Sequence, residues 1–163
     1  MVNVKDVAMY FLNKDADGNL FTKELSEING RIFYTGNARL NKLLHMAQNI
    51  YIAKTGKKLF DADFYAYDNG AVAIEVQENY AVLLARKYTP VIPDEDAKFL
   101  DKIFTIFKNA SIEEMIKLSH EDDEWKRKQG FYDKAEQKMD SLANVEAYKR
   151  QYADILMIME RMS

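Results

Sequence analysis

The chain has no cysteine and little proline or glycine, and these shortages exclude several kinds of protein. Without cysteine among its 163 residues it has no disulfides, thiol nucleophiles or thiolate metal sites, as is usual in a reducing cytoplasm. Two prolines and six glycines favour helices over a many-stranded β fold. No apolar run approaches the roughly 18 residues of a membrane-spanning helix, and no secretory signal opens the sequence. We therefore expect a cytoplasmic protein that does not enter a membrane.

The chain also has little excess of either positive or negative charge. The formal net charge is -3 at pH 7, and the basic residues form only short, scattered clusters. Binding to nucleic acid depends on lysine and arginine that neutralise phosphates, so we expect no direct contact with nucleic acid. Hydrophobic residues make up 48% of the chain and charged residues 30%, which is typical of globular proteins. The length suits one domain, spanning residues 1–163.

Apolar residues recur at helical spacing along most of the chain. The pattern predicts helices over about 3–12, 37–56, 74–86 and 141–161, and further helices that begin near 94 and 111. Asn37 and Asp94 are expected N-caps, and Ser111 with Glu114 forms a capping box. Asn29-Gly30 predicts a small hairpin, and 60–67 an extended segment that ends at a turn over 68–70. The expected fold is mainly α: a single compact helical domain of about six to seven helices, with a small β-hairpin or extended segment near its N-terminal third.

The helix predicted over 141–161 has a heptad-like apolar seam. Spacings of 3, 4, 3, 4 and 3 separate Val145, Tyr148, Tyr152, Ile155, Met159 and Met162. Such a stripe either packs on the helix's own domain or forms a homodimer through the C-terminal helix. We favour the first interpretation and keep the second open.

Motifs for catalysis are absent from the sequence. There is no Gly-x-Ser-x-Gly elbow, no phosphate-binding glycine loop and no paired-histidine zinc motif. His45 lies beside the apolar stripe of its helix, which indicates a structural histidine. We expect a protein that is not an enzyme and needs no cofactor. One alternative stays open, an enzyme with a pocket around Gln48, His120 and Asp122.

Residues 13–24 follow part of the EF-hand pattern. Asp15, Asp17, Asn19 and Glu24 stand at possible oxygen-ligand positions, with Gly18 at the sixth place. Asn13 occupies the first position instead of aspartate, and Asn29-Gly30 leaves no room for the exiting helix. We therefore expect a plain turn and no metal site, with a calcium-dependent module as the alternative.

Several segments, in order, resemble the Panacea domain, also called the SocA-like antitoxin domain. The similarity spans about 4–128, and its most specific parts are Leu40-Asn41-Lys42-Leu43-Leu44-His45-Met46-Ala47-Gln48, Thr55-Gly56-Lys57-Lys58-Leu59-Phe60, Phe64-Tyr65-Ala66-Tyr67-Asp68-Asn69-Gly70-Ala71-Val72 and Leu118-Ser119-His120 followed by Trp125. The chain departs from the family pattern at His45, Tyr67 and Ala71, where tyrosine, tryptophan and proline are usual.

The resemblance implies a role in binding proteins. Panacea domains are antitoxins that neutralise varied toxins by direct contact, and they are common in prophages and mobile elements. The resemblance therefore suggests a phage-associated antitoxin module with a cognate toxin as its partner. The alternative is a phage-encoded inhibitor or proteolytic adaptor that binds a host protein. The signature residues that we expect at the binding site are Gln48, Tyr67, Asp68, Asn69, Gly70, His120 and Trp125, with Trp125 as the first candidate because tryptophan is frequent at binding hot spots.

Overall fold

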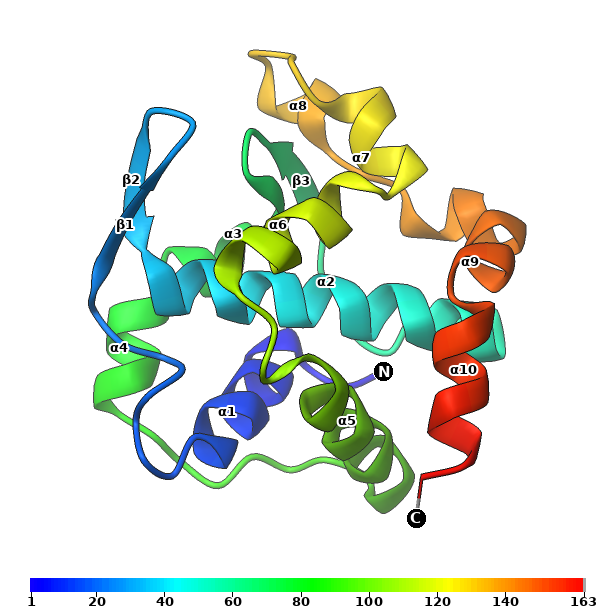
Figure 1. Cartoon of the computed structure of the whole chain (residues 1–163), viewed down its shortest axis with the longest axis horizontal. Helices are drawn as coiled ribbons and strands as arrows, with labels where there is room; N and C mark the ends of the chain where they lie inside the picture. Colours follow the sequence, from blue (N-terminus) through cyan, green and yellow to red (C-terminus); the bar gives the residue numbers. More distant parts are fainter. Residues whose placement is uncertain (163) are drawn as a thin grey trace.

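The computed structural model describes residues 1–162, and they are arranged around one central helix, α2 (Thr35–Thr55). Every residue of α2 from 40 to 50 is buried, because other elements surround the helix (Figure 1). Apolar side chains cover part of its surface, and polar ones such as Asn41, His45 and Asn49 occupy the rest. The helix ends at Gly56, which adopts the left-handed conformation, as the sequence predicts.

The remaining helices are shorter than α2. They are α1 (Val4–Lys14), α3 (Ile74–Gln77), α4 (Tyr80–Ala85), α5 (Asp94–Phe107), α6 (Ile112–His120), α7 (Asp123–Lys128), α8 (Lys134–Gln137), the 3-10 helix η1 (Ser141–Asn144), α9 (Val145–Gln151) and α10 (Ala153–Glu160). Of these, α1, α3, α5, α6 and α9 pack directly against α2. The hydrophobic core lies where α1, α5 and the C-terminal helices meet α2. No helix within residues 1–162 is long and apolar enough to cross a membrane.

Two antiparallel hairpins complete the fold. Strand β1 (Leu25–Ile28) pairs with β2 (Arg31–Tyr34) through the predicted turn, where Asn29 and Gly30 both have positive φ. Strand β3 (Phe64–Tyr67) pairs with β4 (Gly70–Ala73). Both edges of this second hairpin are covered: Met139 N donates to the Phe64 carbonyl, and side chains of α2 and α6 bond to the backbone of β4.

The prediction of a mainly α fold is confirmed, although the described residues form ten α-helices rather than six or seven. The predicted helix over 74–86 is divided at Glu78–Asn79, and the predicted helix over 141–161 is divided into η1, α9 and α10. Strand β4 was not predicted, because all four of its residues are buried and their sequence lacks the alternation of a half-exposed strand.

Helix starts were predicted with mixed success. The capping box of Ser111 and Glu114 is present at α6. Asn37 is not an N-cap, because α2 begins two residues earlier and the Asn37 amide donates to the Gln77 carbonyl. Asp94 is the first residue of α5 and not its cap, which is Pro93.

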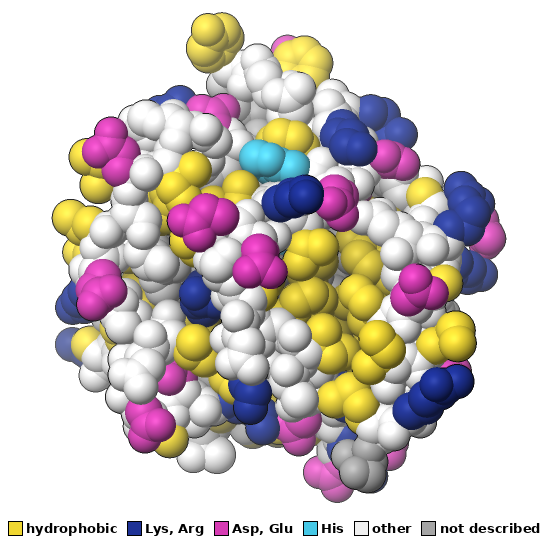
Figure 2. All heavy atoms as spheres, viewed as in Figure 1, with side chains coloured by type: hydrophobic (Ala, Val, Ile, Leu, Met, Phe, Trp, Pro, Cys, Tyr) yellow, Lys and Arg dark blue, Asp and Glu magenta, His cyan; other side chains and the backbone are white. Residues whose placement is uncertain are grey.

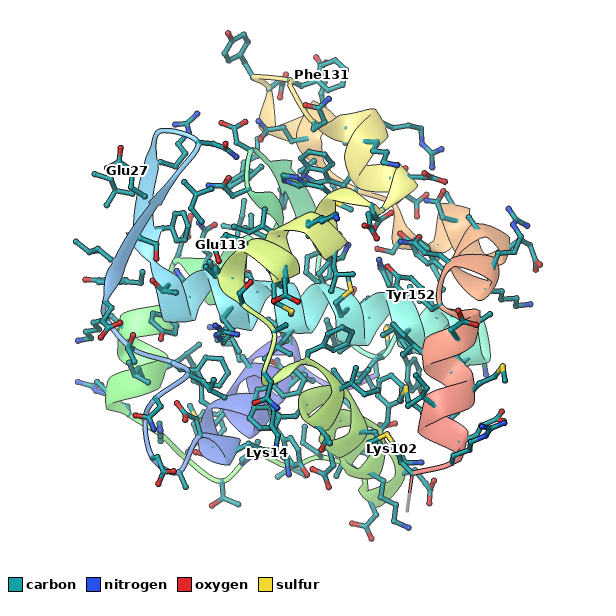
Figure 3. The ribbon with its side chains drawn as sticks, viewed as in Figure 1. Lys14, Glu27, Lys102, Glu113, Phe131 and Tyr152 are labelled. Atoms are coloured by element: carbon teal, nitrogen blue, oxygen red, sulfur yellow. The ribbon has the colours of Figure 1, made fainter. Side chains whose placement is uncertain are left out.

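The apolar seam of the C-terminal segment packs on its own domain, as favoured from the sequence. Tyr148, Tyr152 and Met159 are buried, and Figure 3 shows Tyr152 pointing toward α2. A homodimer through this segment stays a prediction, and it would have to use the exposed side that carries Met157 and Ile158.

Candidate functional site

Six of the seven expected site residues meet at the tip of the β3–β4 hairpin. Tyr67 and Gly70 end the two strands, with Asp68 and Asn69 in the turn between them. His120 Nε2 lies 2.9 Å from the Asp68 carbonyl, and Trp125 Nε1 donates to the Tyr67 carbonyl over 2.9 Å. The two rings stack on one another with centroids 4.0 Å apart. His120 and Trp125 therefore hold the turn in place from α6 and α7.

Gly70 is required at this tip for two reasons. Its φ is +110°, a conformation that side chains with a Cβ rarely adopt. A Cβ there would also come within 2.6 Å of Lys42 Cε and Ser119 Oγ. The close approach of the hairpin to α2 and α6 thus depends on glycine.

Gln48, the seventh expected residue, lies apart from the tip. Its amide donates to the Phe60 carbonyl over 2.8 Å, and its oxygen accepts from the Leu59 amide over 2.9 Å. The side chain is fully buried and fixes the segment before β3. The enzyme alternative requires Gln48 and Asp122 to line an open pocket with His120. Asp122 is fully buried too, so the two residues do not line such a pocket.

A buried polar network that the sequence did not reveal joins α2, α6 and α9. His45 Nδ1 lies 2.8 Å from Ser119 Oγ, and His45 Nε2 lies 2.7 Å from Asp122 Oδ2. Asn49 donates to the same carboxylate, as does the hydroxyl of Tyr148. Burial alone would raise the pKa of Asp122, but its bonds to His45 and Asn49 and to a backbone amide outweigh burial and lower that pKa.

The network contains serine, histidine and aspartate, the side chains of a hydrolase triad, but its geometry indicates a structural role. Ser119, His45 and Asp122 are all fully buried, so a substrate has no route to the serine oxygen in this conformation. That oxygen also accepts the Ala71 amide over 2.9 Å. The network therefore ties β4 to three helices, as expected for the structural histidine inferred from the sequence.

Beside the hairpin tip lies an open groove of about 440 Å³, which we call the interhairpin groove. Its lining residues are Arg31, Ile32, Phe33, Asn37, Ala38, Asn41, Lys42, Tyr67, Asp68, Asn69, Gly70, Val72, Gln77 and Gln137. It lies between β2 and the β3–β4 hairpin, along the first half of α2. An ion pair of Arg31 with Asp68 at 2.9 Å and a hydrogen bond of Asn29 with Asn69 join the two hairpin tips.

Lys42 is the unusual member of this lining. It is only 2% exposed, and its Nζ donates to the Ala71 carbonyl over 3.0 Å. Desolvation lowers the pKa of its ammonium to about 7. A buried amine with such a pKa carries its proton only part of the time near neutrality.

Large apolar side chains are exposed on the elements that flank the groove. Leu25 and Ile32 are 66% and 68% exposed on the β1–β2 hairpin, and Tyr132 in the loop before α8 is fully exposed. Figure 3 shows this hairpin and the loop that carries Phe131 projecting beyond the helices, with Glu27 pointing into solvent. Large exposed apolar side chains around a groove are typical of protein-binding surfaces.

A second, smaller hollow lies between α5 and α10. It measures about 280 Å³, and its lining includes the apolar residues Phe99, Leu156 and Met159 and the lysines Lys98 and Lys102. Figure 2 shows hydrophobic side chains gathered on this face of the molecule, between α6 and α5. The hollow between α5 and α10 contains none of the expected signature residues.

The loop at 13–24 is a carboxylate-stabilised turn. Asp15 Oδ1 accepts from the Asn19 amide, and Asp15 Oδ2 accepts from the amides of Leu20 and Phe21, each within 3.1 Å. Glu24 is followed by strand β1, where an EF-hand has its exiting helix. Within the described part of the chain, no three His, Cys, Asp or Glu residues are grouped to hold a metal. Strand β1 thus departs from the EF-hand pattern, and calcium binding by Asp15, Asp17, Asn19 and Glu24 stays an untested alternative.

Comparison with known proteins gives one match. The family model described as "Antitoxin SocA-like, Panacea domain" matches residues 40–126, just over half of the chain. No curated protein and no solved structure matches. The matched segment extends from α2 to α7 and contains the hairpin tip, Lys42 and most of the buried network. The chain therefore belongs to the SocA-like antitoxin family and carries its Panacea domain.

Proposed function

We propose that this chain is an antitoxin module that neutralises a cognate toxin by direct contact through the interhairpin groove. Membership of the antitoxin family supports the role. The observation that carries the choice of surface is the groove itself, which is lined by the signature residues Tyr67, Asp68, Asn69 and Gly70. The chain acts by binding and not by catalysis, so the proposal requires no cofactor.

The site divides into residues that shape the groove and residues that contact the partner. His120 and Trp125 bond to the turn backbone and are partly buried, so we assign them mainly to shaping it. Ile32 of the groove lining and Tyr132 of the loop before α8 are largely exposed, and we assign them to contact. Trp125, the first candidate from the sequence, stacks on His120 and can contact the partner only with the exposed part of its ring.

We also propose that the protein works in the cytoplasm and is encoded by a phage or mobile element beside its toxin. Its test is growth of bacteria that produce the neighbouring toxic gene product, with and without this chain. We expect growth to resume when the chain is co-produced. Continued arrest at verified levels of both proteins contradicts the proposal. The absence of any toxic neighbour would favour the alternative, an inhibitor or proteolytic adaptor that binds a host protein.

A further inference from the structure

The interhairpin groove is lined by an amine, that of Lys42, which forms an ion pair with no carboxylate of the described residues. An ammonium group has three N–H donors, and among the described residues Lys42 Nζ has one hydrogen-bond acceptor, the Ala71 carbonyl. It takes part in none of the ion pairs found among those residues. Burial of a charge without a counter-charge is unfavourable and lowers the pKa of Lys42, so a carboxylate placed beside Nζ would stabilise the protonated amine.

The other charges of the groove are already paired. Arg31 and Asp68 bind one another across the two hairpin tips. The remaining polar lining residues are neutral: the tyrosine Tyr67 and the amides Asn37, Asn41, Asn69, Gln77 and Gln137. A carboxylate that reaches Lys42 Nζ would therefore meet an amine without a counter-charge, in a groove whose other two charged residues bind one another.

The wall formed by β2 determines the shape of ligand that fits. Arg31, Ile32 and Phe33 are consecutive lining residues. Because successive side chains of a strand point to opposite faces, a run of three indicates that the edge of β2 borders the groove. Ile32 stands opposite Glu27, one pair beyond the two-residue turn. In an antiparallel hairpin, the N–H and C=O groups of such a pair point away from the partner strand. No hydrogen bond to these two groups of Ile32 is found within residues 1–162, so an extended segment can pair with them.

We propose that the interhairpin groove binds an extended acidic segment of the partner protein, with a side-chain carboxylate on Lys42 Nζ and its backbone along the edge of β2. That the partner is a toxin rests on the function proposed above. The carboxylate site itself depends only on the groove, on Lys42 and on the open strand edge.

The site is tested first with small probes. We would follow the amides of Gly70 and Ala71 and the side chain of Lys42 by NMR during titration with N-acetyl-glutamate α-amide. N-acetyl-glutamine α-amide is the neutral control, and N-acetyl-alanine supplies a C-terminal carboxylate instead. We expect saturable shifts with the glutamate probe, at a Kd of the order of 10 mM for so small a ligand, and at least tenfold weaker binding of the glutamine probe.

Variants of the chain separate Lys42 from general charge effects. Lys42→Met keeps the aliphatic stem and removes the charge, and we expect it to fold and to lose the shifts caused by the glutamate probe. Lys108→Met removes one charge from an exposed lysine at the end of α5 and is expected to change nothing. If Lys42→Met fails to fold, the comparison of the glutamate and glutamine probes on the unaltered chain still decides.

Three results would overturn the inference. The first is equal binding of the glutamate and glutamine probes, or of neither probe. The second is unchanged binding to Lys42→Met. The third is binding of N-acetyl-alanine alone, which would assign the site to a C-terminal carboxylate. Growth rescue by the unaltered chain together with any of these results would reject the carboxylate site and leave the antitoxin role intact. Probe binding without growth rescue would support the carboxylate site and reject the antitoxin role.

Discussion

At the scale of single residues, Gly70 and Lys42 determine how closely the β3–β4 hairpin approaches α2. The glycine leaves space that Lys42 and Ser119 fill. The lysine and the serine in turn bond to the carbonyl and amide of Ala71. The local geometry of the groove therefore depends on two side chains and on one absent Cβ.

We predict that Gly70→Ala lowers the free energy of unfolding by about 3 kcal/mol or more, because it combines a positive φ with a steric overlap in the core. Gly18→Ala is the matched control: its φ is +70°, but nothing lies within 4 Å of the added Cβ. Its expected cost is about 1 kcal/mol, for the backbone conformation alone. Urea denaturation measures both, and equal losses would contradict the steric argument.

Lys42 makes stability depend on pH in a defined window. Its pKa falls from 10.5 in the unfolded chain to about 7 in the folded one, so between these values the unfolded chain binds more protons. The contribution of Lys42 to the free energy of unfolding therefore rises with pH from about 7 toward 10 and is constant below that range.

We predict that Lys42→Met is more stable than the unaltered chain at pH 7 and that this advantage shrinks steadily toward pH 10. The advantage at pH 7 is of the order of 4 kcal/mol, less about 1 kcal/mol for the lost bond to Ala71. The buried tyrosines are common to both proteins and largely cancel, whereas the pKa of His120, which burial and the charge of Lys42 both lower, rises in Lys42→Met. Denaturation curves at pH 7, 8, 9 and 10 measure the difference, and an advantage that does not change with pH would contradict the account.

The buried network shows what sequence reasoning cannot reach at this scale. The structural role of His45 was predictable from its place beside an apolar stripe. Its partners Ser119 and Asp122 lie more than 70 positions away, and no local pattern links them to α2. The one available signal was the number of polar residues on a helix that must be buried, such as Asn41 and Asn49, since buried polar groups need partners.

At the scale of elements, the β1–β2 hairpin has exposed apolar side chains and an open strand edge that a partner could cover. Leu25 and Ile32 are exposed on it, and the edge of β2 is open toward the groove. The β3–β4 hairpin differs, because its strand edges are covered by 138–139 and by side chains of α2 and α6. We therefore expect the first hairpin to take part in binding and the second to support it.

We predict that Ile32→Ser and Tyr132→Ser each reduce growth rescue while changing the free energy of unfolding by less than about 0.5 kcal/mol, as is usual for exposed positions. The matched control is Val91→Ser, which alters an 85% exposed apolar residue in the loop before α5. It should rescue as well as the unaltered chain. Equal rescue by all three variants would exclude the exposed side chains of Ile32 and Tyr132 as contacts with the partner.

The sequence predicted elements well where a local signal was strong. Asn29-Gly30 fixed the first hairpin, and the capping box fixed the start of α6. It failed where tertiary packing decides. Strand β4 has the short sequence Gly-Ala-Val-Ala and exists because β3, α2 and α6 enclose it. The C-terminal helix bends at Tyr152, whose hydroxyl accepts a hydrogen bond from Asn49 of α2, and nothing in its heptad pattern indicates that interruption.

At the scale of the whole molecule, the fold places a polar groove and its exposed apolar border at one end of α2. The family signature spans elements from α2 to α7, which explains why the signature residues converge in space although they are up to 58 positions apart, as Tyr67 and Trp125 are. Most of the signature residues are buried or bond to the backbone around the β3–β4 hairpin and so keep the groove in shape. The contact surface that we propose includes residues outside the matched segment, among them Ile32 and Tyr132.

The central claim is direct contact between this chain and its toxin, and the most direct measurement is calorimetric titration of the purified toxin with the purified chain. We predict saturable binding with a Kd below about 1 µM, weakened at least tenfold by Ile32→Ser combined with Tyr132→Ser and unaffected by Val91→Ser. Growth rescue in cells without any binding between the purified proteins would contradict the claim.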